Sequence, residues 1–134
     1  TIKVLKHVPG VGDRCHLDRN YTFRSLGGFA DRPDMHYVLT SNDDKMTPNK
    51  KVMWTLTAKV PVTVYLNFRS LDHVRMTGGN RPDGWLAKDG WKASDVRSTV
   101  STGIPNGPYQ GPVFARDVES GVVELMGSQC GEGA

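Results

Sequence analysis

The sequence has no apolar run long enough to cross a membrane and no ten-residue segment with the apolar spacing of an amphipathic helix. A membrane-spanning helix needs roughly 20 mostly apolar residues. The longest approach, residues 60–68, is interrupted by Pro61, Thr63 and Asn67. With 134 residues, 37% of them hydrophobic and 23% charged, the chain has the length and composition of one soluble globular domain. We therefore expect no membrane insertion.

Charge of one sign is not concentrated anywhere in the chain. The 17 Lys and Arg residues are scattered among 14 acidic residues, and the densest basic run is only Lys50-Lys51. Proteins that bind nucleic acid carry their basic residues on one face or along one helix. The net charge of +3 therefore indicates a solvated surface, with weak attraction to acidic polysaccharide as its one long-range consequence.

Cysteine is scarce, with Cys15 and Cys130 near opposite ends of the chain. We predict that they form a disulfide, and two buried free thiols are the alternative. A closed loop of about 100 residues stabilises a fold by about 4.7 kcal/mol in the chain-entropy model. A disulfide indicates an extracellular protein, and two features agree with that location. Asn20 lies in the chain's one N-glycosylation motif, and a chain that begins at Thr1 fits removal of a leader.

Short strands separated by turn residues account for most of the chain. Residues 52–58 and 62–68 alternate apolar and polar side chains most regularly, which places one face of each strand in a core. Residues 113–116 and 122–126 flank a turn and predict a hairpin. Weaker alternation predicts strands at 2–8, 21–26 and 36–40. About eight or nine such strands predict an all-β fold, a single antiparallel β-sandwich of the Ig-like or jelly-roll-like kind.

Five sequence pieces occur in an order that is typical of one protein family. They are GD with DRNYTF (12–13 and 18–23), YVLTSNDDK (37–45), VTVYLNFR (62–69), GWL with GW (84–86 and 90–91) and GVVELMGS (121–128). Together they resemble a small β-sandwich module that secreted bacterial proteins carry, glycoside hydrolases and polysaccharide lyases among them. The resemblance covers about residues 11–128.

The resemblance implies an extracellular accessory role without catalysis, often assumed to be carbohydrate binding, and it supplies no established binding residue. The chain departs from the family pattern in three places. Asn67-Phe68 stands where the family has Asp before Arg, and residues 102–109 resemble an insertion. The apolar strand that closes the module is not found before Ala134.

No residue pattern typical of catalysis is present. Hydrolysis of a glycosidic bond takes two carboxylates across a cleft, whereas Asp43 and Asp44 are adjacent in a turn-forming segment. A nucleophile elbow is absent, and the four histidines lack metal-ligand spacing. We therefore expect no enzyme, no cofactor and no metal. Residues 42–45 are predicted to hold a turn by bonding nearby backbone amides through their own side chains.

Three aromatic residues are the candidates for sugar contact: Trp85, Trp91 and Tyr109. Trp54 lies in the apolar register of its strand and is assigned to the core. Trp85 and Trp91 flank a segment bounded by glycines, and they either stack on sugars or close one end of the sandwich. The second role is the commoner one for large aromatic side chains. Tyr109 lies in a loop rich in Pro and Gly and is expected to be exposed.

The segment 1–8 resembles a strand and is set off by Pro9-Gly10, so residues 1–10 are expected to form an extension and residues 11–134 the module. A sandwich without its last strand would leave an open groove and edge, which a neighbour's strand can fill. We predict an interface formed by the apolar residues of the segment: Ile2, Val4, Leu5 and Val8. The alternative is pairing of this segment within its own domain.

These observations predict a non-catalytic extracellular subunit with a structural or adhesive role. Exchange of the N-terminal strand would build a head-to-tail homopolymer, that is, a fibre. The alternative function is that of a carbohydrate-binding accessory module from a secreted polysaccharide-degrading enzyme.

Overall fold

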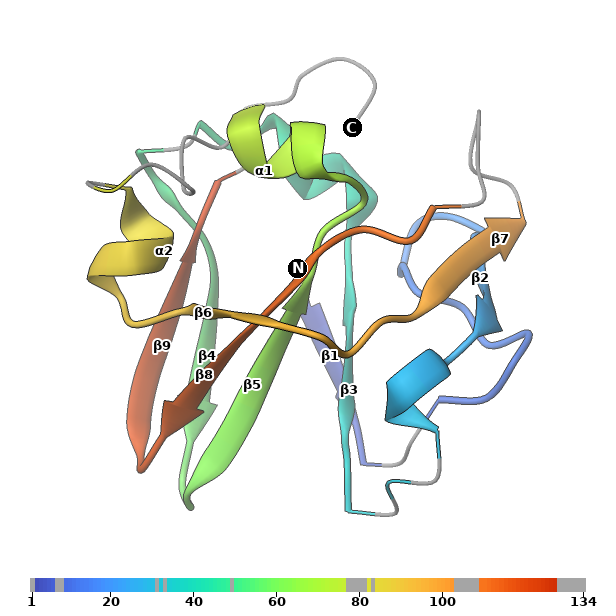
Figure 1. Ribbon diagram of the computed structural model, residues 1–134, viewed down its shortest axis with the longest axis horizontal. Helices are drawn as coiled ribbons and strands as arrows, with labels where there is room; N and C mark the ends of the chain where they lie inside the picture. Colours follow the sequence, from blue (N-terminus) through green and yellow to red (C-terminus); the bar gives the residue numbers. More distant parts are fainter. Residues whose placement is uncertain are drawn as a thin grey trace. The chain divides into compact units, whose positions relative to one another are not determined.

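The computed structural model describes residues 2–6, 9–30, 32, 34–48, 50–76, 82, 84–102 and 109–127 (Figure 1). Within these residues the fold is mostly β, with small antiparallel sheets and a few short helices, so the predicted all-β class is confirmed. The described strands are β1 (Ile2–Leu5), β2 (Thr22–Ser25), β3 (Tyr37–Thr40), β4 (Val52–Ala58), β5 (Val62–Asn67), β6 (Lys92–Ser94), β7 (Thr99–Thr102), β8 (Val113–Val118) and β9 (Gly121–Met126). The helices are η1 (Gly27–Phe29), η2 (Asn42–Met46), α1 (Leu71–Met76) and α2 (Trp85–Lys88), of which η1 and η2 are 3₁₀ helices.

The chain forms two compact units. Unit 1 consists of Thr1–Asp44 and Val96–Gly111, and unit 2 consists of Lys45–Asp95 and Pro112–Ala134. The strand predicted within residues 1–8 is present as β1 and belongs to unit 1. The division into an extension, 1–10, and a module, 11–134, stays a prediction.

Unit 1 contains two small sheets. β1 pairs with β3 from Ile2 opposite Thr40 to Leu5 opposite Tyr37. β2 pairs with β7, with two irregularities in register. An isolated parallel bridge from His16 to Thr40 ties the first loop to the end of β3.

In this structure β1 pairs with β3, which is the alternative left open by the sequence, and exchange of the segment with a neighbouring subunit stays a prediction. One edge of Ile2–Leu5 pairs with Tyr37–Thr40. Val4 is 50% exposed within the single chain. A partner within the same chain is favoured because its pairing avoids the entropy lost on association. Val8, the remaining member of the predicted interface, lies outside the described residues.

Unit 2 contains two sheets that share one core. β4 pairs with β9, and the other sheet has the order β5-β8-β6 (Figure 1). The hairpin predicted for residues 113–116 and 122–126 is wrong, since β8 and β9 belong to different sheets. The bend at Glu119 and Ser120 leads from one sheet to the other. This crossing turns the apolar faces of both strands into the same core.

The core of unit 2 draws on both sheets and on both short α-helices. Its buried residues are Val74 of α1, Leu86 of α2, Trp91, and Val123 and Leu125 of β9. Eight partly buried side chains pack against them: Trp54, Leu56, Val64, Leu66, Phe68, Trp85, Phe114 and Val118. The assignment of Trp54 to the core is therefore confirmed. The helices escaped prediction because six and four residues are too few to show an apolar stripe.

Gly127 holds the end of β9 against the loop that precedes β4. Its N–H donates to the carbonyl of Lys51 at 2.8 Å. A Cβ at this position would lie 2.3 Å from the Thr47 carbonyl oxygen and 2.2 Å from that of Pro48. These are backbone atoms, which cannot rotate away as a side chain would. The glycine is required here because the two chain segments approach so closely.

Replacing Gly127 with Ala is expected to destabilise the protein by about 2–4 kcal/mol, because the added methyl overpacks a rigid site. Urea unfolding followed by circular dichroism measures this loss. Gly10→Ala is the matched control, since a Cβ there meets only Asp13 Oδ2 at an ordinary 3.5 Å. A Gly127→Ala variant as stable as Gly10→Ala would contradict the close approach.

Candidate functional site

The sheet β5-β8-β6 has one apolar face in the core and an opposite face that carries polar side chains. Val64 and Leu66 alternate with Thr63 and Tyr65 along β5, and only the first two pack against the core. The opposite face of β8 presents Ala115 and Asp117, and that of β6 presents Lys92 and Ser94. We call this the polar face. At one end of the polar face, where Asn67 lies opposite Val113, the Val113 side chain is buried and only 1% exposed. At the other end, the paired residues Thr63 and Asp117 are both exposed.

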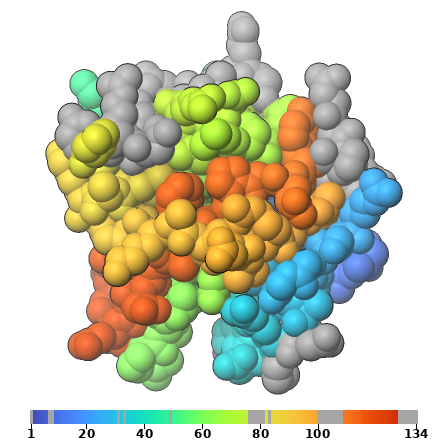
Figure 2. All heavy atoms as spheres, viewed as in Figure 1, coloured from blue at the N-terminus to red at the C-terminus, as the bar shows by residue number. Residues whose placement is uncertain are grey.

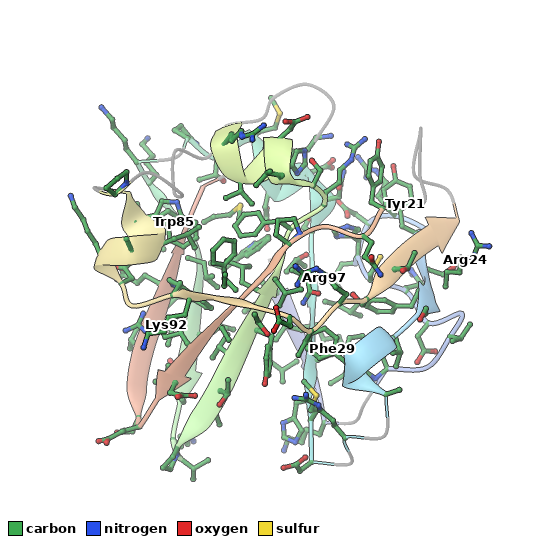
Figure 3. All side chains as sticks on the ribbon, viewed as in Figure 1. Tyr21, Arg24, Phe29, Trp85, Lys92 and Arg97 are labelled. Carbon is green, nitrogen blue, oxygen red and sulfur yellow. The ribbon has the colours of Figure 1, made fainter. Side chains whose placement is uncertain are left out.

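A hollow of about 510 Å³ lies on the polar face. The described residues that line it all belong to unit 2: Thr63, Tyr65, Gly90, Lys92, Ala93, Ser94, Ala115 and Asp117. Figure 2 shows the segment of β6 at the visible surface, and Figure 3 shows Lys92 projecting from it. Its lining is mainly polar and is open to solvent.

The register of three strands positions the side chains of the hollow. Tyr65 lies opposite Ala115 on β8, and Lys92 lies opposite the same residue from β6. In the next row, the Thr63 hydroxyl donates to Asp117 Oδ1 at 2.6 Å. This bond orients the Asp117 carboxylate and leaves it further acceptor positions, while the Lys92 ammonium offers three donors. An aromatic ring, a donor and an acceptor thus surround the small side chain of Ala115.

Trp85 and Trp91, which were expected either to stack on sugars or to close one end of the sandwich, pack in the core of unit 2. Trp91 is 5% exposed, and Trp85 packs against the same core. Their indole Nε1 atoms are buried and have no hydrogen-bond partner among the described residues. Trp85 is the first residue of α2, Trp91 follows the helix, and both rings pack into the core. Tyr109, expected to be exposed, is half-buried in unit 1.

A carboxylate clamp in unit 1 joins two of the sequence pieces on which the family resemblance rests. Asp18 accepts hydrogen bonds from the Ser41 hydroxyl at 2.8 Å and from the backbone N–H groups of Asn42 at 2.7 Å and Asp43 at 3.0 Å. Arg19 binds the Asp43 carboxylate at 2.6 Å. The Asp18 side chain therefore caps the start of η2, as an N-cap residue does from within a helix's own chain segment.

The clamp adds a contact from a distant residue to this turn, while the expectation that the side chains of residues 42–45 bond nearby backbone amides stays a prediction. The amides of Asn42 and Asp43 are bound by Asp18, which lies 24 and 25 residues earlier in the sequence. Burial favours the neutral form of Asp18, but the hydrogen bonds from Asn42, Asp43 and Ser41 outweigh it and hold the pKa well below its ordinary value of 3.8. Such a shift marks a structural carboxylate that stays ionised.

Cys15 is a free thiol in this structure, and its predicted partner Cys130 lies outside the described residues. The disulfide therefore stays a prediction. The Cys15 Sγ donates to the Tyr21 carbonyl at 3.1 Å. Burial raises the pKa of the Cys15 thiol to about 11, against the weaker opposing effects of its backbone hydrogen bond and of Arg14. A thiol with so high a pKa is a poor nucleophile at neutral pH.

The remaining predicted features concern modification, metals and membranes. Asn20 is exposed, as a glycosylated asparagine has to be, and its modification stays a prediction. Among the described residues, no group of three or more His, Cys, Asp or Glu side chains is arranged to hold a metal ion. In the same residues, no helix is long and apolar enough to cross a membrane.

Replacing Asp18 with Ala is expected to cost about 1–2 kcal/mol, the usual loss when a capping side chain is removed. The folded pKa lies below the unfolded one, so this stabilisation is present above about pH 4 and is lost as the pH falls further. Urea unfolding of both proteins between pH 7 and pH 2.5 measures the difference.

Asp43→Ala is the control for this measurement. It removes only the exposed ion pair with Arg19 and is expected to cost less than about 1 kcal/mol. Equal losses for the two variants, or a difference between wild type and Asp18→Ala that does not shrink in acid, would contradict the clamp.

Cys15 is expected to react with iodoacetamide at least about tenfold more slowly than free cysteine at pH 8, because little of it is ionised. Reduced, folded Cys130→Ser protein isolates this thiol, and mass spectrometry follows the reaction. The rate should rise steeply up to about pH 11, and unfolding in urea should abolish the protection. Rapid alkylation of the folded protein would show that the thiol is not buried as described.

No protein-family model, curated protein sequence or solved structure matches this chain. The resemblance to the secreted β-sandwich module therefore rests on the five sequence pieces alone and stays a prediction.

Proposed function

We propose that this chain is a non-catalytic extracellular β-sandwich module that binds carbohydrate on its polar face. The hollow over β5, β8 and β6 is the observation that carries the proposal. In it an aromatic ring, hydroxyls and opposite charges line a common space. The proposal includes the single sandwich of eight or nine strands expected from the sequence.

The chemistry of the lining matches the chemistry of a sugar. A pyranose ring has an apolar face of C–H groups, which an aromatic ring such as that of Tyr65 can cover. Its hydroxyls both donate and accept hydrogen bonds, and Lys92 and Asp117 supply the complementary groups. Sites of this kind combine apolar contact with a few well-placed polar groups.

The lining also supports a role without catalysis. Hydrolysis of a glycosidic bond canonically takes two carboxyl groups on either side of the bond. Asp117 is the single carboxylate among the described residues that line the hollow. Its partner there is the Thr63 hydroxyl, which fixes its orientation. We therefore assign Asp117 to ligand binding.

We rank carbohydrate binding before assembly, which is the reverse of the order expected from the sequence. Assembly into a fibre requires the N-terminal strand to be available to a neighbour, whereas β1 already pairs with β3. Carbohydrate binding needs no rearrangement of the described strands. The fibre therefore has less support than the binding module, which was the alternative.

Affinity electrophoresis through gels that contain soluble polysaccharides tests the proposal. At least one of mixed-linkage β-glucan, xylan, galactomannan, pectate and alginate should retard the wild-type protein. Tyr65→Ala should weaken this binding at least about tenfold, the loss of 1.4 kcal/mol that one dominant aromatic contact readily accounts for. Tyr65→Phe keeps the ring and should retain most of the affinity.

Tyr109→Ala is the matched aromatic control, because Tyr109 lies in unit 1 and does not line the hollow. Its binding should equal that of the wild type. Loss of binding in Tyr109→Ala with full binding in Tyr65→Ala would move the site away from the polar face. Melting curves of each variant exclude unfolding as the cause.

A further inference from the structure

The hollow has the cross-section of a trough along β8. Tyr65, Ala115 and Lys92 lie in one row across three strands. Neighbouring strands are about 4.8 Å apart, so the Cα atoms of Tyr65 and Lys92 lie roughly 10 Å apart with only a methyl group between them. Two large side chains therefore flank a gap that suits one sugar ring, with Ala115 as its floor.

The charges of the lining sum to zero. Lys92 contributes one positive charge and Asp117 one negative charge, and the other described lining residues are uncharged. A neutral sugar satisfies both groups at once, because its hydroxyls accept from the ammonium and donate to the carboxylate. The carboxylate of an acidic sugar would gain from Lys92 but would be repelled by Asp117 at close range.

The Thr63 hydroxyl strengthens this selection. It donates to Asp117 Oδ1 at 2.6 Å and so orients the carboxylate, whose other lone pairs face the hollow as acceptors. Asp117 therefore stays an acceptor, available to sugar hydroxyls and unfavourable to anions. Lys92, on the far side of Ala115, can still reach a hydroxyl of the same ring through its long, flexible side chain.

We infer that the polar face selects neutral hexopyranose chains, with one ring over Ala115 between Tyr65 and Lys92 and its hydroxyls bound by Lys92 and Asp117. This inference rests on the proposed carbohydrate binding and specifies its ligand class. Discrimination comes from the single carboxylate, because it is the one group of the lining that an anionic sugar cannot satisfy.

Isothermal titration of the full chain with neutral β-glucan and galactomannan oligosaccharides, and with oligogalacturonate, tests the ligand class. Binding of a neutral oligosaccharide should change less than about threefold between 50 and 500 mM NaCl, because no net charge is neutralised. Oligogalacturonate should bind at least tenfold more weakly than the best neutral ligand.

Two charge variants give the sharpest evidence. Asp117→Asn and Lys92→Gln should each weaken binding of the neutral ligand about three- to tenfold, because each removes a charge-assisted hydrogen bond. If the ligand were acidic, the two variants would change the affinity in opposite directions: Asp117→Asn would bind more tightly, and Lys92→Gln would lose binding. Tighter binding by Asp117→Asn would therefore overturn the inference.

Filling the trough tests the position of the ring. Ala115→Leu should weaken binding at least tenfold, while Thr55→Leu, which adds a leucine at an exposed site on β4, should leave it unchanged. Salt-sensitive binding of oligogalacturonate alone would overturn the ligand class and keep the proposed function. Failure of well-folded protein to bind either class would overturn both.

Discussion

The alternation of side chains along β5 and β8 is the constraint on which unit 2 depends. Val64 and Leu66 of β5 and Phe114 and Val118 of β8 pack in the core, where Phe114 meets Phe68 edge to face with their centroids 5.8 Å apart. The same alternation sends Tyr65, Ala115 and Asp117 to the opposite face. Core and candidate site are therefore two sides of one pattern, and a shift in register by one residue would exchange them.

Strand positions could be read from the sequence because their signal is local. The alternation within residues 52–58 and 62–68 predicted β4 and β5 to within one residue. Strand pairing could not be read in this way. The short bends after Ala58 and Val118 have the lengths of hairpin turns, yet they join strands of different sheets. Nothing in a short turn sequence states whether the next strand pairs with the last one or packs across the core from it.

The candidate site escaped prediction for a related reason. Thr63 and Tyr65 were recognisable as the polar register of β5, but Asp117 lies 54 residues further along the chain. The register that brings the two strands together is a property of the folded sheet. The tryptophans were the more visible candidates, because a Gly-bounded segment resembles a loop. Four residues of helix at α2 suffice to turn such a segment inward.

The Asp18 clamp gives a structural reason for two of the sequence pieces on which the family resemblance rests. DRNYTF and SNDDK look like two independent motifs, but Asp18 from the first binds two amides and a hydroxyl of the second. Gly127 plays a comparable part in the last piece, where its missing side chain admits the carbonyls of Thr47 and Pro48. These pieces are thus explained by the folding of the chain without reference to a ligand. The proposed site is only partly covered by the pieces: Thr63, Tyr65 and Gly90 lie in the third and fourth pieces, whereas Lys92, Ala115 and Asp117 belong to none of the five. Proteins built on the same clamp and glycine could therefore keep the fold while their polar faces take different ligands.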